Sequence, residues 1–174
     1  MRRLFSFPNP VNDTSARLVA AGVVLQAVVF LILRSGWLLI PLTYGFAARV
    51  LTGPTLSPLG QLSTRVLTPL IRTEHRFLPG PPKRFAQAVG LVFAGGASAA
   101  WLSSIPALAD VLIAMLTIAA SLEAGRGICL GCKAFAVLMR RGIIPESVCE
   151  QCSNVTSRLI AASAEKSESS MSPI

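Results

Sequence analysis

The stretch FAQAVGLVFAGGASAAWLSSIPALADVLIAMLTIAASLEA, residues 85–124, decides the fold of this chain. Its only charged residues are Asp110 and Glu123. A helix that crosses a bilayer needs about 20 mainly apolar residues at 1.5 Å of rise per residue. The stretch divides before a proline into residues 85–105 and 106–124, each close to that length. We therefore predict two consecutive membrane-spanning α-helices.

Two shorter apolar blocks lie nearer the N-terminus, at residues 18–33 and 37–51. Pro41 interrupts the second block, and only residues 34–36 separate the two. They predict either two strongly tilted spans or a shallow re-entrant hairpin, and we count them as spans. The predicted fold class is all-α: an integral membrane bundle of four transmembrane helices, an interfacial helix in the central loop, and a cytoplasmic cysteine-rich helical cap.

The composition is that of a membrane protein, with 52% hydrophobic residues, 14% charged residues and a mean hydropathy of +0.62. In the predicted topology, Arg34 lies alone on one side and fifteen of the sixteen basic residues lie on the other. The positive-inside rule makes that other side cytoplasmic, so both termini are expected there. Trp37 and Trp101 fall near the opposite interface, where tryptophan anchors helices. The first apolar block follows the polar stretch NPVNDTSAR with no small-residue cleavage site, so we expect the first helix to stay attached.

The net charge of +8 raises the question of nucleic acid. The basic residues are spread over segments that flank the membrane, without interleaved aromatic residues, which indicates contact with anionic lipid headgroups instead. No Ser/His/Asp set, phosphate-binding loop or dinucleotide fingerprint is present, which argues against hydrolases and nucleotide enzymes. The spans carry too few polar groups to line a path for a substrate, so we rank a transporter below the zinc-binding and redox functions considered next.

The central loop, residues 52–84, contains a helix start at Ser57-Pro58. Leu59, Leu62, Val66 and Leu70 follow at helical spacing, and Arg65 and Arg72 would mark the polar edge of an interfacial helix. In the third block, Gly90 and Ala94 form a small-x-x-x-small pair that permits close helix contact. The pattern leaves open whether that contact lies within one chain or between copies in a homo-oligomer.

All four cysteines occur after the last apolar block, as Cys129/Cys132 and Cys149/Cys152. The spacing matches the pattern of a tetrathiolate zinc site, C-x2-C-x15–20-C-x2-C. Cytosolic thiols stay reduced, so clustered cysteines there act as metal ligands or catalytic thiols more often than as structural disulfides. We therefore expect residues 129–152 to form a cap in which these four cysteines bind zinc, and which serves as a docking or assembly module.

The alternative is a membrane-anchored dithiol redox or sulfur-relay protein. Cys129 and Cys132 open a predicted helix, where backbone N–H groups favour a thiolate, and basic side chains lie nearby. Glu146 and Glu150 flank the second pair and would raise its thiol pKa. In this reading Cys129 or Cys132 is the catalytic thiol that attacks a disulfide or persulfide of the partner, and the second pair resolves the intermediate or passes the redox equivalents on.

Three blocks resemble the bacterial family of domain of unknown function 4395: FAARVLTGPTLSPLGQL, GPPKRFAQAVGLVF and LEAGRGICLGCKAFAVLMRRGIIPESVCEQC. The resemblance runs from about Asn12 to Cys152, and CLGC is its most specific part. Gly45 stands where the family pattern has an acidic residue. The resemblance implies a multi-pass protein of the bacterial inner membrane, with thioredoxin-like or sulfurtransferase partners in some members, and no established reaction.

The remaining candidates are single residues. Asp110 and Glu123 are acidic residues near the two ends of the fourth block, and Glu123 is placed to accept from a thiol or to pair with Arg126. His75 is the only histidine and is expected to be solvated, and Arg49 is expected to extend toward headgroups. The predicted organisation is a cytoplasmic segment 1–16, a membrane domain 17–128, the cap 129–152 and a disordered tail 153–174.

Overall fold

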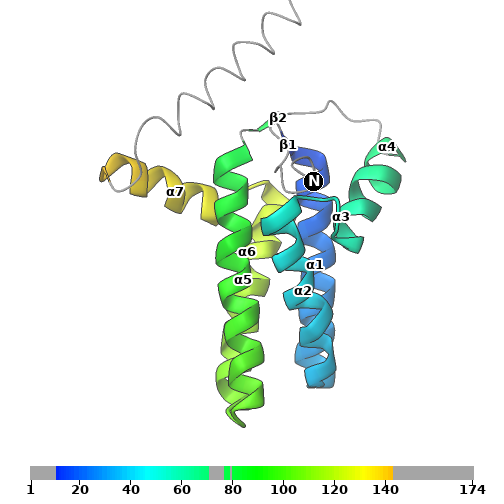
Figure 1. Ribbon diagram of the computed structural model, residues 1–174, viewed down its shortest axis with the longest axis vertical. Coiled ribbons are helices and arrows are strands. Elements are labelled where there is room, and N and C mark those ends of the chain that lie inside the picture. Colours follow the sequence, from blue (N-terminus) through cyan, green and yellow to red (C-terminus); the bar gives the residue numbers. More distant parts are fainter. Residues whose placement is uncertain (1–10, 71–76, 79, 143–174) are drawn as a thin grey trace, which may run out of the picture.

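The computed structural model describes residues 11–70, 77–78 and 80–142. The described chain is almost entirely helical, which confirms the all-α class (Figure 1). The one extended feature is the two-residue strand β1 (Val11–Asn12), which pairs antiparallel with β2 (Phe77–Leu78), Val11 opposite Leu78. The predicted tail 153–174, and most of the segment 1–16, lie outside the described residues.

Three helices of the described chain are long and apolar enough to span a membrane: α1 (Asp13–Leu33), α5 (Gly80–Leu102) and α6 (Pro106–Arg126). Helix α1 is longer than the predicted block 18–33, because it begins at Asp13. Asn12 caps it and accepts a hydrogen bond from the Thr14 N–H at 2.9 Å. That cap adds a turn of polar residues, Asp13 to Arg17, to the helix.

The prediction of four spans is wrong for the second block. A 3₁₀ turn, η1 (Gly36–Leu38), precedes α2 (Leu39–Thr52), which has 14 residues and ends at Gly53 with φ 66°. At 1.5 Å per residue α2 is about 21 Å long, against a hydrocarbon core of about 30 Å. Pro41 does not break α2, because it lies in the first turn, where a missing N–H costs no hydrogen bond.

The predicted helix at Ser57-Pro58 is present. It consists of α3 (Pro58–Leu62), a π-helical turn η2 (Ser63–Leu67) and α4 (Thr68–Leu70). The Ser57 hydroxyl accepts from the Gly60 N–H at 3.2 Å. Leu62, Val66 and Leu70 are exposed, whereas the Thr68 hydroxyl is buried and meets the Ser15 hydroxyl of α1 at 2.8 Å. The apolar side of this helix therefore faces outward, as a lipid environment requires.

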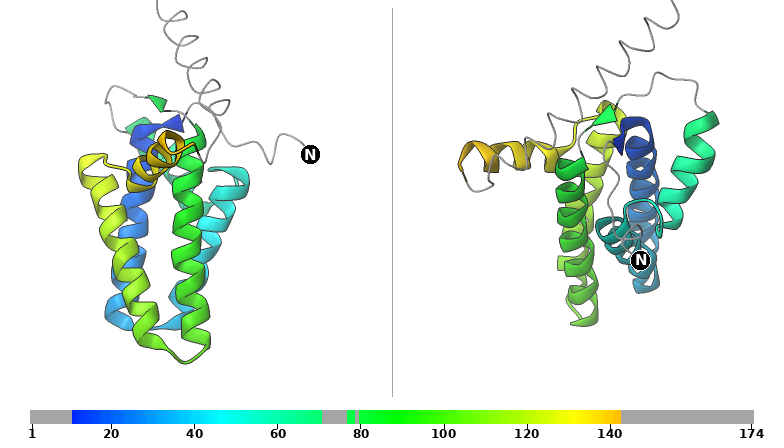
Figure 2. Two further views of the ribbon diagram at one scale, coloured as in Figure 1. Left: turned by 90° about the vertical axis from the view of Figure 1, so that its left-hand side faces the viewer. Right: turned by 45° about the horizontal axis from the view of Figure 1, so that its top comes forward.

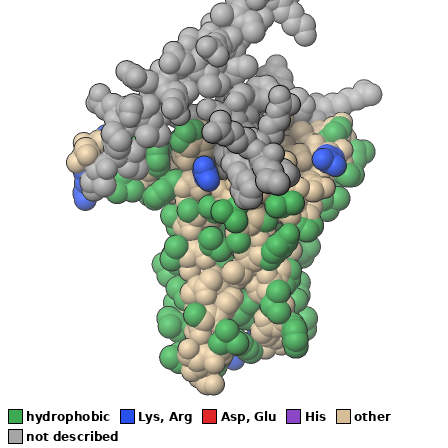
Figure 3. Space-filling view, viewed as in Figure 1, with side chains coloured by type: hydrophobic (Ala, Val, Ile, Leu, Met, Phe, Trp, Pro, Cys, Tyr) green, Lys and Arg blue, Asp and Glu red, His purple; other side chains and the backbone are tan. Residues whose placement is uncertain are grey.

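The core lies where α1, α2, α5 and α6 meet, around Phe30, Leu42, Phe46 and Ile113. Gly90 lets α5 approach α2, since a Cβ there would lie 2.2 Å from the Phe46 ring. Gly90 thus serves packing within the chain. Figure 3 shows hydrophobic side chains over the body of the bundle, with basic side chains near its two ends.

The start of α1, the start of α5 and the end of α6 lie at one end of the bundle (Figures 1 and 2). Arg17 connects two of them, because its Nε donates to the Ala124 carbonyl at 3.2 Å. A last helix, α7 (Leu130–Arg140), packs against α5 at this end and projects sideways away from the bundle. The start of α1, the start of α5 and the first cysteine pair thus lie at one end of the bundle, and the placement of this end in the cytoplasm stays a prediction.

Candidate functional site at the first cysteine pair

Cys129 is the N-cap of α7. Gly127 follows the end of α6, its left-handed φ of 67° turns the chain, and α7 begins three residues later at Leu130. The Cys129 backbone is extended, and its sulfur accepts a hydrogen bond from the Cys132 N–H at 3.3 Å. The two thiols are free. The helix therefore begins on a sulfur, at the end where its dipole favours negative charge.

The two thiols of this turn differ in pKa. The Cys132 thiol donates to the Cys129 sulfur and lowers the pKa of Cys129, helped by the Cys132 N–H and by the charge of Lys83, against burial and Glu123. The same hydrogen bond, together with burial, raises the pKa of Cys132. Cys129 is thus the thiol that ionises first, although only 8% of its surface is exposed.

A buried charge cluster lies beside the cysteine turn. Lys83, in the first turn of α5, is only 3% exposed. Its Nζ lies 2.7 Å from Glu123 Oε1 of α6 and 3.5 Å from Asp13 Oδ1 of α1. Glu123 was predicted to serve a thiol or pair with Arg126, but its described partner is Lys83. Lys83 was not predicted as a site residue, because the predicted block began at residue 85. The sequence GPP at 80–82 carried the signal: proline fits the first turn of a helix, which places the start of α5 before Lys83.

The site is held in place by close packing between α7 and α5. A Cβ on Gly131 would lie 2.5 Å from the Ala86 Cβ, so the α7 backbone rests directly on α5. Phe135, buried on α7, meets Phe85 with ring centroids 5.6 Å apart. These contacts fix the position of the cysteine turn relative to α5, whereas a loop without such contacts would leave that position free.

Two cavities adjoin the turn, one on each side of α7. A cavity of about 290 Å³ touches Leu130, Gly131 and Ala134, and extends between α5 and α6. A second, of about 380 Å³, touches Cys132, Lys133 and Ala136, and reaches Lys83. Cys129 lines both cavities. The cysteine that ionises first is thus the one that lies between the two cavities.

Several predicted site residues are placed elsewhere. Cys149, Cys152 and His75 lie outside the described residues, so the second half of the zinc pattern is untested. Within residues 11–70, 77–78 and 80–142, no three His, Cys, Asp or Glu side chains gather closely enough to hold a metal ion. Asp110 lies at the opposite end of the bundle, where it forms an ion pair with Arg34.

Arg49 does not extend toward headgroups as predicted. It is 5% exposed, its Nε donates to Gln87 Oε1 at 2.8 Å, and its guanidinium carbon lies 4.5 Å from the centre of the Phe46 ring. Gly45 is one turn away, and a Cβ there would lie 3.3 Å from the Arg49 NH1 atom. Gly45 therefore lies against a buried cation.

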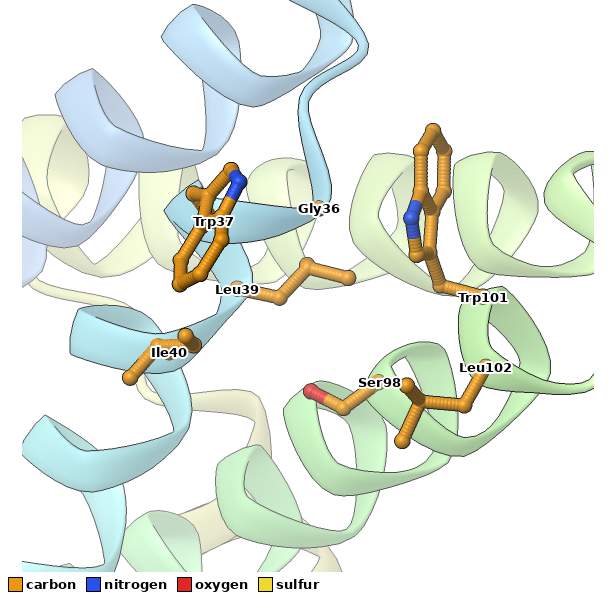
Figure 4. Close-up of a pocket in the computed structure, with 7 residues that line it drawn as sticks. All are labelled: Gly36, Trp37, Leu39, Ile40, Ser98, Trp101 and Leu102. Carbon is orange, nitrogen blue, oxygen red and sulfur yellow. The ribbon is translucent and has the colours of Figure 1, made fainter.

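A further cavity, of about 310 Å³, lies at the end of the bundle opposite the cysteines. Figure 4 shows it between Trp37 of η1 and Trp101 of α5, with Leu39, Ile40 and Leu102 on its walls. Its lining includes no ionisable or nucleophilic group other than the Ser98 hydroxyl, which is bonded to Thr43 and to the Ala94 carbonyl. It offers apolar volume near an interface and no reactive chemistry.

The family model described as "Domain of unknown function (DUF4395)" matches residues 11–140. The match covers the membrane helices and the cysteine turn, and it confirms the resemblance predicted from the sequence blocks. No curated protein and no solved structure matches the chain.

Proposed function

We propose, for a chain that belongs to the family described as "Domain of unknown function (DUF4395)", a function as a membrane-anchored dithiol redox protein. Cys129 and Cys132 cycle between two thiols and one disulfide. The observation that carries the proposal is the Cys129 sulfur at the N-cap of α7, hydrogen-bonded to the Cys132 N–H at 3.3 Å. A thiolate is the reactive form of cysteine, and a helix N-terminus stabilises it.

The reaction is thiol–disulfide exchange with a partner protein. The Cys129 thiolate attacks a sulfur of the partner's disulfide and forms a mixed disulfide, and the partner's second sulfur leaves as a thiolate. Cys132 then attacks the Cys129 sulfur and releases the partner as a dithiol. The cavity of about 380 Å³, with Lys83 and Lys133 on its walls, offers the leaving thiolate a positive surrounding.

The partner is a thioredoxin-like or sulfurtransferase protein on the side of the membrane that carries the cysteines. We place that side in the cytoplasm of a bacterial cell, because the basic residues that flank the spans favour the cytoplasmic leaflet. A sulfurtransferase would deliver a persulfide to the same thiolate, which gives the pair a role in sulfur relay.

Zinc binding is the second candidate. Cys129 and Cys132 lie on one turn, and the Cys132 N–H already donates to a sulfur, as in a half-formed tetrathiolate site. Cys149 and Cys152 would complete the tetrahedron and make the cap a docking module. The redox function is preferred because Cys129 lines two cavities, whereas a structural metal site is closed.

Metal content and disulfide formation separate the two candidates. Protein is purified in detergent without chelator, its zinc is measured, and it is incubated with oxidised glutathione. We expect less than stoichiometric zinc, a loss of about two mass units, and a disulfide mapped to Cys129 and Cys132. Cys129→Ser and Cys132→Ser abolish that disulfide, while the double variant Cys149→Ser/Cys152→Ser keeps it.

One zinc per chain, with thiols protected until the metal is removed, would overturn the redox proposal. The same conclusion would follow if each of the four Cys→Ser variants unfolded the cap to an equal degree, because a tetrahedral site needs all four ligands.

A further inference from the structure

The cavity of about 290 Å³ connects the cysteine turn to the membrane-spanning part of the chain. Its walls are apolar side chains of two spanning helices, Val89 and Phe93 from α5 and Met115 and Leu116 from α6. Glu123 and Cys129 lie at its polar end. Because Met115 is about half exposed on the outer surface of α6, the cavity borders the region where lipid would lie.

We propose that this cavity binds the ring of a membrane quinone, which takes up the electrons of the Cys129–Cys132 dithiol; this rests on the redox function proposed above. The occupant has to come from the bilayer, because the cavity lies between α5 and α6. It has to be small, since about 290 Å³ is at the lower limit of ligand pockets, about 300 Å³.

The chemistry at the polar end requires a two-electron acceptor. A quinone is the lipid-soluble carrier class that meets this need, and an acyl chain is not, because it cannot oxidise a thiol. The near-complete burial of Cys129 also favours a flat ring over the broad surface of a protein on this side of α7. A protein partner approaches instead through the second cavity, which both Cys129 and the half-buried Cys132 line.

The step balances without a further reactant. The Cys129 sulfur adds to the quinone ring, and the Cys132 sulfur then attacks the Cys129 sulfur. The bond between sulfur and ring breaks, and a disulfide forms. The two electrons and the two thiol protons end on the ring, which leaves as quinol. The dithiol of a thioredoxin-like protein then reduces the Cys129–Cys132 disulfide, and its own disulfide is the second product. This is the thiol–disulfide exchange proposed above, run in the opposite direction.

The test follows decylubiquinone reduction by pre-reduced protein in detergent, with thiol loss followed by intact mass. We expect one quinol per chain, loss of two thiols from Cys129 and Cys132, and a rate that saturates with quinone. Ala119→Phe fills the cavity from α6 without touching a thiol and lowers that rate at least tenfold. Ala107→Phe, at an exposed position of the same helix, leaves the rate unchanged.

Oxidation by oxidised glutathione is measured on the same samples. It should proceed equally in all three proteins, because glutathione does not use the apolar cavity. If Ala119→Phe fails to fold, Met115→Trp narrows the same cavity from a half-exposed position and is expected to slow quinone reduction in the same way.

Three results would overturn the quinone site while the redox function stands. These are oxidation by glutathione without quinone reduction, an unchanged quinone rate in a folded cavity variant, and a stable quinone adduct in place of the disulfide. If neither oxidant links Cys129 to Cys132, the redox function itself fails.

Discussion

At the scale of single residues, Cys129 and Cys132 show how one turn makes two different thiols. Cys129 precedes α7 and receives two hydrogen bonds, one from the Cys132 thiol and one from its N–H. Cys132 lies inside the helix and donates rather than accepts. The order of reactivity therefore follows mainly from which thiol donates to the other, and the Cys132 N–H at the helix start adds to the lowering of the Cys129 pKa.

This asymmetry predicts the pH dependence of alkylation. A lowered pKa leaves Cys129 ionised at pH values where an ordinary thiol is protonated, and a raised pKa keeps Cys132 protonated. We expect iodoacetamide to modify Cys129 first, with a pH profile that lies at lower pH than that of an ordinary thiol. Peptide mass spectrometry after short labelling times checks this.

Cys132→Ala is the matched control for the labelling experiment. It removes the donor thiol and should shift the pH profile of Cys129 upward, while the backbone N–H still contributes. An unchanged profile in Cys132→Ala, or faster labelling of Cys132 in the parent protein, would contradict the assignment.

Arg49 and Gly45 form the second single-residue case. Arg49 is buried, and its hydrogen bonds run to the neutral side chains of Gln87 and Ser57. Gly45→Asp places a carboxylate one turn away and should raise the thermal midpoint above that of Gly45→Ala. The alanine variant alone gains about 0.5–1 kcal/mol from helix propensity, so it is the reference. A thermal midpoint for Gly45→Asp at or below that of Gly45→Ala would show that the free-energy cost of burying the new carboxylate with Arg49 exceeds their attraction.

At the scale of elements, Lys83 joins three spanning helices through Asp13 of α1 and Glu123 of α6. Lys83→Met leaves two acids partly buried without their partner. We expect it to destabilise the protein by about 3 kcal/mol, the lower end of the range for a broken buried pair, because both acids retain some exposure. Chemical unfolding in detergent measures this difference.

The double variant Lys83→Met/Glu123→Gln, together with both single variants, forms a double-mutant cycle for the Lys83–Glu123 ion pair. It should be more stable than Lys83→Met, since it removes one of the two unpaired charges. Equal or lower stability of the double variant would mean that the ion pair does not connect α5 and α6 energetically.

The contact between α7 and α5 depends on Gly131. Gly131→Ala places a Cβ 2.5 Å from the Ala86 Cβ, so α7 must move away from α5. Overpacking of this kind costs about 1–3 kcal/mol, and the displaced turn should expose Cys129 to faster alkylation. Gly95→Ala is the control, because a Cβ there meets no atom within 4 Å. Gly131→Ala with the labelling rate of the parent protein would rule out this docking.

At the scale of the whole molecule, the two ends of the bundle carry different groups. Lys83, Arg17 and the cysteine turn lie at one end, and the Arg34–Asp110 ion pair and the tryptophan-lined cavity lie at the other. With the basic residues facing the cytoplasm, we expect the turn that contains Ser103 to face outward.

Orientation is tested with single cysteines in a background of four Cys→Ser substitutions. Ser103→Cys should react with a membrane-impermeant maleimide on intact cells, and Lys133→Cys should react only after permeabilisation. Labelling in the opposite order would place the cysteine turn outside and remove the cytosolic partners from consideration.

The sequence by itself determined the all-α class and the two long apolar helices within residues 85–124, and it predicts one side of the membrane for the basic segments. These follow from apolar length and charge, which are local properties of the chain. It also located the start of the central helix, because Ser57 and Pro58 carry a local capping signal. The length of α1 and the shortness of α2 were misjudged, since a polar first turn and a 3₁₀ turn do not alter hydropathy.

Only the tertiary structure decided which charged side chains pair and which cavities adjoin Cys129. Lys83 lies 70 residues from Asp13 and 40 from Glu123, and no periodicity of the sequence connects positions so far apart. Arg49 looked like an interfacial arginine, yet the helix pairing of α2 with α5 buries it beside Gln87. The two cavities around the cysteine turn likewise exist because α7 is held across α5 by Gly131 and Phe135, and such packing is a property of the folded chain alone.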